Sequence, residues 1–179
     1  MKPENTALDT RRETSKRPCR FCKTELQHRV VDLGTSPLCQ KHVKPSELQQ
    51  MERFFPLQAF VCDNCWLVQL EEFAAADDIF DHDYAYFSSF STSWLAHCKQ
   101  YVDDMTKRWG LNRSSFVVEI ASNDGYLLQY FNEKKIPVLG IEPTANTAEV
   151  AIEKGIPTEV AFFGTATACL LYTSDAADE

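Results

Sequence analysis

The sequence lacks a long apolar run and has little basic charge. Lys and Arg number 18 against 26 Asp and Glu, so the formal net charge is −8. A protein that binds duplex nucleic acid needs a basic face to displace counterions, and this composition argues against that class. No stretch approaches the roughly 20 apolar residues of a membrane span. Residues 1–18 contain no apolar segment typical of a signal peptide. We therefore expect neither nucleic acid nor a membrane as a partner.

Glycine is also scarce, with six residues in the chain. The dinucleotide-binding pattern G-x-G-x-x-G is absent, which argues against a nicotinamide oxidoreductase. Cysteine, in contrast, occurs seven times. Without an export signal, paired cysteines bind metal more often than they form disulfides. We therefore predict a cytoplasmic protein with a metal site.

Composition divides the chain into segments of different character. A globular core is expected, because 44% of the residues are hydrophobic and 25% are charged. The predicted segments are a flexible tail at 1–17, a small metal-stapled β domain at 18–75, a helical lead-in at 76–112 and alternating strands and helices at 113–168. Residues 169–179 resemble the translation of a sequencing adapter, so we expect a non-native tail and a truncated natural protein.

A helix and a parallel sheet are predicted after residue 76. Apolar residues recur at helical spacing from Trp94 to Trp109, Ser91 can cap the start, and Gly110 ends the pattern. Residues 115–120 and 137–141 indicate strands, of which the first is expected to be buried. Strand–helix–strand–helix order with short links predicts an α/β fold with a parallel sheet.

Two C-x-x-C pairs predict a zinc site. Each pair forms a tight turn that presents two thiolates, and two such turns complete the tetrahedral four-sulfur shell of a structural zinc ion. The predicted ligands are Cys19, Cys22, Cys62 and Cys65. A closed shell leaves no position for water, so we expect no catalysis there. Cys39 and His42 also have ligand spacing and are interpreted as incidental.

A second candidate site follows the first predicted strand of the parallel sheet. Residues 121–125 form a loop of small and polar residues between a strand and a helix, where α/β sheets bind nucleotide-like ligands. Glu142 ends the next strand and can accept ribose hydroxyls. Glu119 and Asp124 make the loop acidic, which suits the cationic S-adenosylmethionine and repels a pyrophosphate. A ligand-free structural turn, or a zinc-stapled module that binds a nucleotide ligand or nucleic acid without catalysis, remains an alternative.

Several motifs together resemble one enzyme family. They are the two C-x-x-C pairs, Val31-Asp-Leu-Gly34, Cys65-Trp-Leu-Val-Gln-Leu70, Asp83-Tyr-Ala-Tyr-Phe-Ser-Ser89, Glu119-Ile-Ala-Ser-Asn-Asp-Gly-Tyr126 and Gly140-Ile-Glu-Pro-Thr144. In this order they resemble S-adenosylmethionine-dependent sugar C-methyltransferases, which methylate C3 of a nucleotide-linked 4-keto deoxysugar. The resemblance implies a small zinc-binding N-terminal domain followed by an incomplete Rossmann-like class I methyltransferase domain at 76–168.

The resemblance also assigns roles to individual residues. The implied cofactor-binding residues are Glu119, Ala121, Ser122, Asn123, Asp124, Gly125, Glu142, Pro143, Phe87 and Ser89. Tyr84 and Tyr86 are implied catalytic residues that orient the sugar or transfer a proton, with core packing as the alternative role. The implied cofactors are S-adenosylmethionine and structural zinc, and the implied substrate is a nucleotide-linked sugar. The general base has no match in this chain, so we expect the chain as given to be inactive. The sugar and the oligomeric state are left open.

Overall fold

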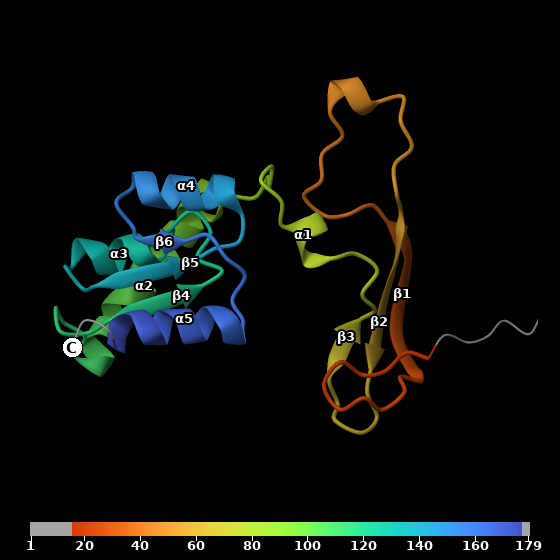
Figure 1. Ribbon diagram of the computed structural model, residues 1–179, viewed down its shortest axis with the longest axis horizontal. Coiled ribbons are helices and arrows are strands. Elements are labelled where there is room, and N and C mark those ends of the chain that lie inside the picture. Colours follow the sequence, from red (N-terminus) through yellow and green to blue (C-terminus); the bar gives the residue numbers. More distant parts are fainter. Residues whose placement is uncertain (1–15, 177–179) are drawn as a thin grey trace, which may run out of the picture. The chain divides into compact units, whose positions relative to one another are not determined.

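Two separate three-stranded sheets organise the chain, which is α/β as predicted (Figure 1). The computed structural model describes residues 16–176. One unit comprises the residues up to Pro37 together with Glu52–Phe73, and the other comprises Leu38–Met51 together with the residues from Ala74 onward. The segment Leu38–Met51 therefore lies between two strands of the first unit in sequence but groups with the second unit. The tail predicted at 1–17 falls almost entirely outside the described residues.

The first unit is an antiparallel sheet with a small core. Its strands are β1 (His28–Ser36), β2 (Phe55–Val61) and β3 (Val68–Leu70), in spatial order β1-β2-β3. Among the described residues of this unit, the buried apolar cluster consists of Cys19, Leu26, Phe60 and Cys62. Almost all of β1 is exposed. So few buried side chains supply little folding energy, and a unit of this size needs a metal or a similar cross-link.

The second unit contains a parallel sheet, which confirms the strand–helix–strand–helix prediction. The strands β4 (Val117–Ile120), β5 (Val138–Ile141) and β6 (Thr158–Glu159) pair in that order. The helical segments are η1 (Pro45–Glu47), α1 (Ala76–Ile79), η2 (Ser88–Phe90), α2 (Thr92–Trp109), α3 (Leu128–Glu133), α4 (Ala145–Glu153) and α5 (Thr165–Ala176). The core gathers Val102, Leu128, Phe131, Ile136, Val138, Ala151 and Ile156.

Helix α2 begins and ends where its sequence predicts. The Ser91 hydroxyl accepts the Trp94 N–H at 3.3 Å and caps the start. Gly110 adopts a left-handed φ of 64°, and its N–H bonds to the Thr106 carbonyl. Cys98, predicted to lie on the apolar face, is 2% exposed. Local capping and periodicity therefore determine this helix.

The prediction of a fully buried first strand is wrong for one face of β4. Val118 and Ile120 are 44% and 54% exposed, and the preceding Phe116 is 62% exposed. Val117, on the other face, packs against the core. Strand β4 is an edge strand of the described sheet. An edge strand packed on one side shows the alternation of a half-buried strand rather than burial on both faces.

The segment interpreted as a non-native tail continues a helix. Residues from Cys169 onward belong to the last turns of α5 up to Ala176, and 177–179 lie outside the described residues. Among the helices of residues 16–176, none combines the length and apolarity needed to cross a membrane.

Candidate metal centre and cofactor site

Two tight turns carry the four cysteines of the predicted zinc site. The Lys23 N–H bonds to the Cys19 carbonyl at 3.0 Å, and the Trp66 N–H bonds to the Cys62 carbonyl at 2.9 Å. Lys23 and Trp66 close these turns with positive φ values of 64° and 62°. The two turns thus have the same backbone geometry although their sequences differ.

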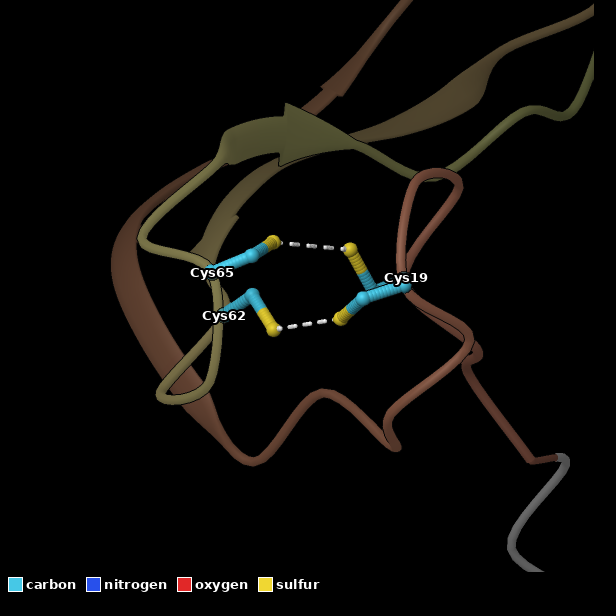
Figure 2. A group of neighbouring side chains, drawn as sticks. Cys19, Cys62 and Cys65 are labelled. Carbon is cyan, nitrogen blue, oxygen red and sulfur yellow. Dashed lines mark hydrogen bonds between the residues drawn. The ribbon is translucent and has the colours of Figure 1, made fainter.

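The four sulfur atoms converge on one point (Figure 2). All of them lie within 4.8 Å of one another. The Cys19 and Cys65 sulfurs are 3.6 Å apart, and those of Cys22 and Cys62 are 3.5 Å apart. Tetrahedral Zn–S bonds of about 2.3 Å would place sulfurs roughly 3.8 Å apart. The sulfur positions therefore fit a single tetrahedral zinc ion.

Polar neighbours favour the thiolate form, which zinc requires, at Cys19 and Cys22. Hydrogen bonds with the side chains of Thr24 and Asn64 lower the pKa of Cys22 to about 5. Burial and the neighbouring thiols instead raise the pKa of Cys65 to about 12. The Gln69 amide, 7% exposed on β3, donates to the Cys19 sulfur at 3.2 Å. Its oxygen accepts the Arg20 N–H at 2.9 Å. Such outer partners orient metal ligands. This role of Gln69 was not predicted from the sequence. The feature that could have indicated it is a single polar residue between the apolar Val68 and Leu70.

The rival pair Cys39 and His42 lies elsewhere. Cys39 is exposed, and within residues 16–176 the group suited to a metal ion contains only Cys19, Cys22, Cys62 and Cys65.

The loop at 121–125 packs closely against β5 and against Ile156. Ala121, Asn123 and Gly125 adopt positive φ values of 59°, 50° and 74°. A Cβ atom on Gly125 would lie 2.4 Å from the Ile156 side chain, so this position has no room for another residue. A Cβ on Gly140 of β5 would likewise lie 2.4 Å from the Ser122 hydroxyl. The loop therefore depends on two glycines: Gly125, where it meets Ile156, and Gly140, where β5 meets Ser122.

Glu142 fastens the end of β5 to this loop. Its side chain is buried, and its Oε2 accepts the Asn123 N–H at 2.8 Å. Its Oε1 accepts the N–H and the hydroxyl of Thr144 at 2.9 and 2.5 Å. Because each carboxylate oxygen has two lone pairs, Oε2 retains one acceptor position. The ribose-binding role of Glu142 stays a prediction, as does that of the partly buried Pro143 beside it.

Three carboxylates and several unpaired acceptors gather at the loop. Within residues 16–176, buried side-chain atoms without a hydrogen-bond partner include Glu119 Oε2, Ser122 Oγ and Asp124 Oδ1. Burial raises the pKa of Glu119 to about 7, a hydrogen bond from Tyr126 opposes the shift, and the charges of Glu142 and Asp124 add to it. Unpaired buried acceptors are rare in folded proteins. This site therefore has the character of a receptor for a cationic hydrogen-bond donor.

The Tyr84–Ser89 segment lies against the same loop. The Ser88 N–H donates to Asn123 Oδ1 at 2.8 Å, and the Asn123 amide donates to the Tyr86 carbonyl at 3.1 Å. The Ser89 N–H donates to Asp124 Oδ2 at 3.3 Å. The family resemblance placed these two segments in one site. In the structure, hydrogen bonds between the backbone of residues 86–89 and the side chains of Asn123 and Asp124 hold them together.

The aromatic side chains of this segment point to different surroundings. The Tyr84 ring packs on Phe80 with centroids 5.6 Å apart, and burial raises the pKa of its hydroxyl. Phe87 stacks on Phe90 at 5.3 Å, and Tyr86 is 50% exposed. The catalytic roles of Tyr84 and Tyr86 and the cofactor contacts of Phe87 and Ser89 remain predictions.

Two polar residues at this site were missed in the sequence. Asn146 on α4 donates its amide to the Tyr84 carbonyl at 2.8 Å. Lys154, which follows α4, donates to the Asp124 carbonyl at 2.8 Å. Neither contact has a local signal, because the partners lie 62 and 30 residues apart.

Replacing Glu119 by glutamine should stabilise the protein at pH 8 and change little below pH 4. The pKa of Glu119 rises from 4.5 to about 7 in the folded state. Stability from such a carboxyl is full below its unfolded pKa and is lost as the pH rises through the folded value. Glutamine avoids this loss, which is on the order of 3 kcal/mol. Thermal unfolding of both proteins between pH 4 and pH 8 measures it.

The exposed residue Glu133 supplies the matched control. Glu133→Gln should keep the pH dependence of the parent protein. If the melting temperatures of the parent and of Glu119→Gln change with pH in the same way, the raised pKa of Glu119 is contradicted.

Comparison with known proteins bears on both sites. Residues 19–80 match the Methyltransf_13 family model, described as "Putative zinc binding domain". The chain is 34% identical over 145 residues to the C-methyltransferase NovU of Streptomyces niveus, an alignment that covers 81% of this chain and 34% of that relative. The chain thus spans about one third of the length of this relative. All four cysteines of the cluster lie within the family match. Residues 19–80 are therefore similar to this family of zinc-binding domains, and the resemblance of the chain to C-methyltransferases is confirmed.

Proposed function

We propose that this chain is part of an S-adenosylmethionine-dependent C-methyltransferase that acts on a nucleotide-linked 4-keto deoxysugar. Residues 113–168 would form the first part of a Rossmann-like class I domain, and the zinc domain would be structural. The observation that carries the proposal is the acidic loop at the carboxyl ends of β4 and β5, with its unpaired buried acceptors. Ligands of open α/β sheets bind at this edge.

The chemistry of S-adenosylmethionine matches these acceptors. Its ammonium group is a cationic hydrogen-bond donor, and its sulfonium carries a second positive charge. Asp124 Oδ1 is an unpaired acceptor of the opposite charge, and Glu119 Oε2 becomes one when its carboxyl group loses its proton. The free acceptor position of Glu142 suits a ribose hydroxyl. When bound, the cofactor supplies an activated methyl group.

The rest of the proposal concerns the reaction of the whole protein. The relative is a C-methyltransferase by name. In a 4-keto sugar, the carbonyl acidifies the proton on C3, so a base can remove it and the resulting carbanion can accept a methyl group. Tyr86, which is half exposed beside the loop, is proposed to orient the sugar, and Tyr84 to assist proton transfer. Correct positioning of the two reactants would provide much of the rate enhancement.

Cofactor binding, rather than turnover, tests this proposal, because the chain spans about one third of its relative. Calorimetric titration should detect binding of S-adenosylmethionine and of S-adenosylhomocysteine. It should detect no binding of NAD⁺. Asp124→Asn should lower the affinity for S-adenosylmethionine roughly tenfold or more, because it replaces a charged acceptor by a neutral one.

The control is Asp104→Asn, on the exposed side of α2, which should bind like the parent protein. Binding of NAD⁺, or no binding of either sulfur ligand by folded protein with its zinc, would refute the cofactor assignment. Tight, salt-sensitive binding of nucleic acid would instead favour a binding module.

A further inference from the structure

Lys154 connects the acidic loop to the segment that lies over it. Its ammonium donates to the Asp124 carbonyl at 2.8 Å and to the Ser89 hydroxyl at 3.1 Å. It also lies 3.4 Å from Asp124 Oδ2. One side chain therefore contacts η2 and the loop after β4 from a position at the end of α4.

The charge of Asp124 makes this contact important. The Asp124 side chain is 2% exposed, whereas that of Lys154 is 32% exposed. Within residues 16–176, Lys154 forms the ion pair of this buried carboxylate. A buried charge that loses its partner is strongly destabilised. Repulsion from Glu119 would add to that loss.

The contacts with Lys154 and Ser89 also fix the orientation of the Asp124 carboxylate. Oδ2 of Asp124 faces Lys154 and the Ser89 N–H, which is 3.3 Å away. The other oxygen, Oδ1, is left without a partner in the described residues. We call the contacts of Lys154 with Asp124 and Ser89 the tether. The tether occupies one oxygen of the Asp124 carboxylate and leaves the second oxygen for a ligand.

We propose that Lys154 is a positioning residue of the cofactor site, which holds Ser89 and Asp124 together and keeps the charged Asp124 turned toward the cofactor. The tether itself follows from the contacts of Lys154, whereas its effect on cofactor affinity rests on the proposed function. A simpler role is that of a cation at a helix C-terminus, which interacts with the helix dipole. That role would not depend on Asp124.

The test compares Lys154→Met and Lys154→Arg with the surface control Lys134→Met. Lys134 pairs with Asp103 at 2.6 Å and has a similarly exposed side chain, at 37%. The first readout is amide hydrogen exchange of residues 86–91 and 122–125 in the ligand-free chain. Lys154→Met should speed exchange there at least tenfold, Lys154→Arg should largely restore protection, and Lys134→Met should have no effect on these residues.

The second readout is S-adenosylhomocysteine affinity, measured well below the melting temperature of each variant. Lys154→Met should weaken binding about tenfold in the parent protein and less than twofold in the Asp124→Asn background, since the partner charge is then absent. Equal losses in both backgrounds, or unchanged exchange and affinity, would overturn the proposal. If the parent protein binds no S-adenosylhomocysteine, the proposed function fails, and unchanged exchange would still refute the tether independently.

Discussion

Cys62→Ser abolishes zinc binding and unfolds the first unit: this is the expected result with the largest effect. The Cys62 side chain is fully buried and belongs to both the sulfur cluster and the four-residue core of that unit. A structural zinc site supplies on the order of 10 kcal/mol. That equals the whole stability of many domains, about 5–15 kcal/mol. The described residues of this unit form no second buried cluster that could compensate, so its folded state should not survive the loss.

Elemental analysis and thermal melting measure this result. The parent protein should hold one zinc ion per chain, and Cys62→Ser should hold none and lose the melting transition of the first unit. Cys39→Ser is the matched control, because Cys39 is exposed and lies outside the cluster. It should keep the metal and the melting temperature. Retention of zinc and unchanged melting in Cys62→Ser would show that these four sulfurs do not form the site.

Gly125→Ala should destabilise the second unit by about 2–5 kcal/mol and eliminate cofactor binding. Two effects add. The positive φ of 74° disfavours any residue with a Cβ. The new Cβ would also lie 2.4 Å from Ile156 Cδ1 and 3.2 Å from Ala151 Cβ. Both neighbours are core residues, 1% and 0% exposed, so they have little room to move.

Two further variants separate these effects. Gly155→Ala introduces the same backbone strain at a φ of 78°, but nothing lies within 4 Å of the added Cβ. Its melting temperature should fall less than that of Gly125→Ala. Ile156→Val removes the clashing Cδ1 atom, so it should recover part of the stability when combined with Gly125→Ala. Equal effects of the two glycine variants would mean that the close approach to Ile156 does not limit the loop.

Helix α2 and the two cysteine turns could be predicted from the sequence, because each depends on residues that are close together in the chain. Helix α2 has a cap, an apolar period and a terminal glycine, and all three lie within one segment. The four cysteines lie on two short turns, each set by its local sequence. The meeting of the two turns at one metal site is the part that requires a contact between residues far apart in the chain. Pattern and turn chemistry are sufficient in such cases.

The contacts that shape the acidic loop could not be predicted in the same way. Asn123, Asn146 and Lys154 bond to residues 30 to 65 positions away, and no periodicity records such pairs. The exposed face of β4 was missed for another reason. A short apolar run such as Phe116–Ile120 fits a strand buried on both faces as well as a strand packed on one. Burial is then decided by which neighbours the strand has.

The path of the chain has a consequence for dividing this protein into pieces. The chain passes between the two units three times, after Pro37, after Met51 and after Phe73. Lys41 and Lys44, from the segment between β1 and β2, pair with Asp81 and Asp83 at 2.6 and 2.5 Å. A gene fragment that stops after Phe73 would therefore encode the zinc ligands together with a loop deprived of its partners. Exchanging the first unit between related proteins by a single cut would separate this loop from the second unit, so the two units have to be exchanged together.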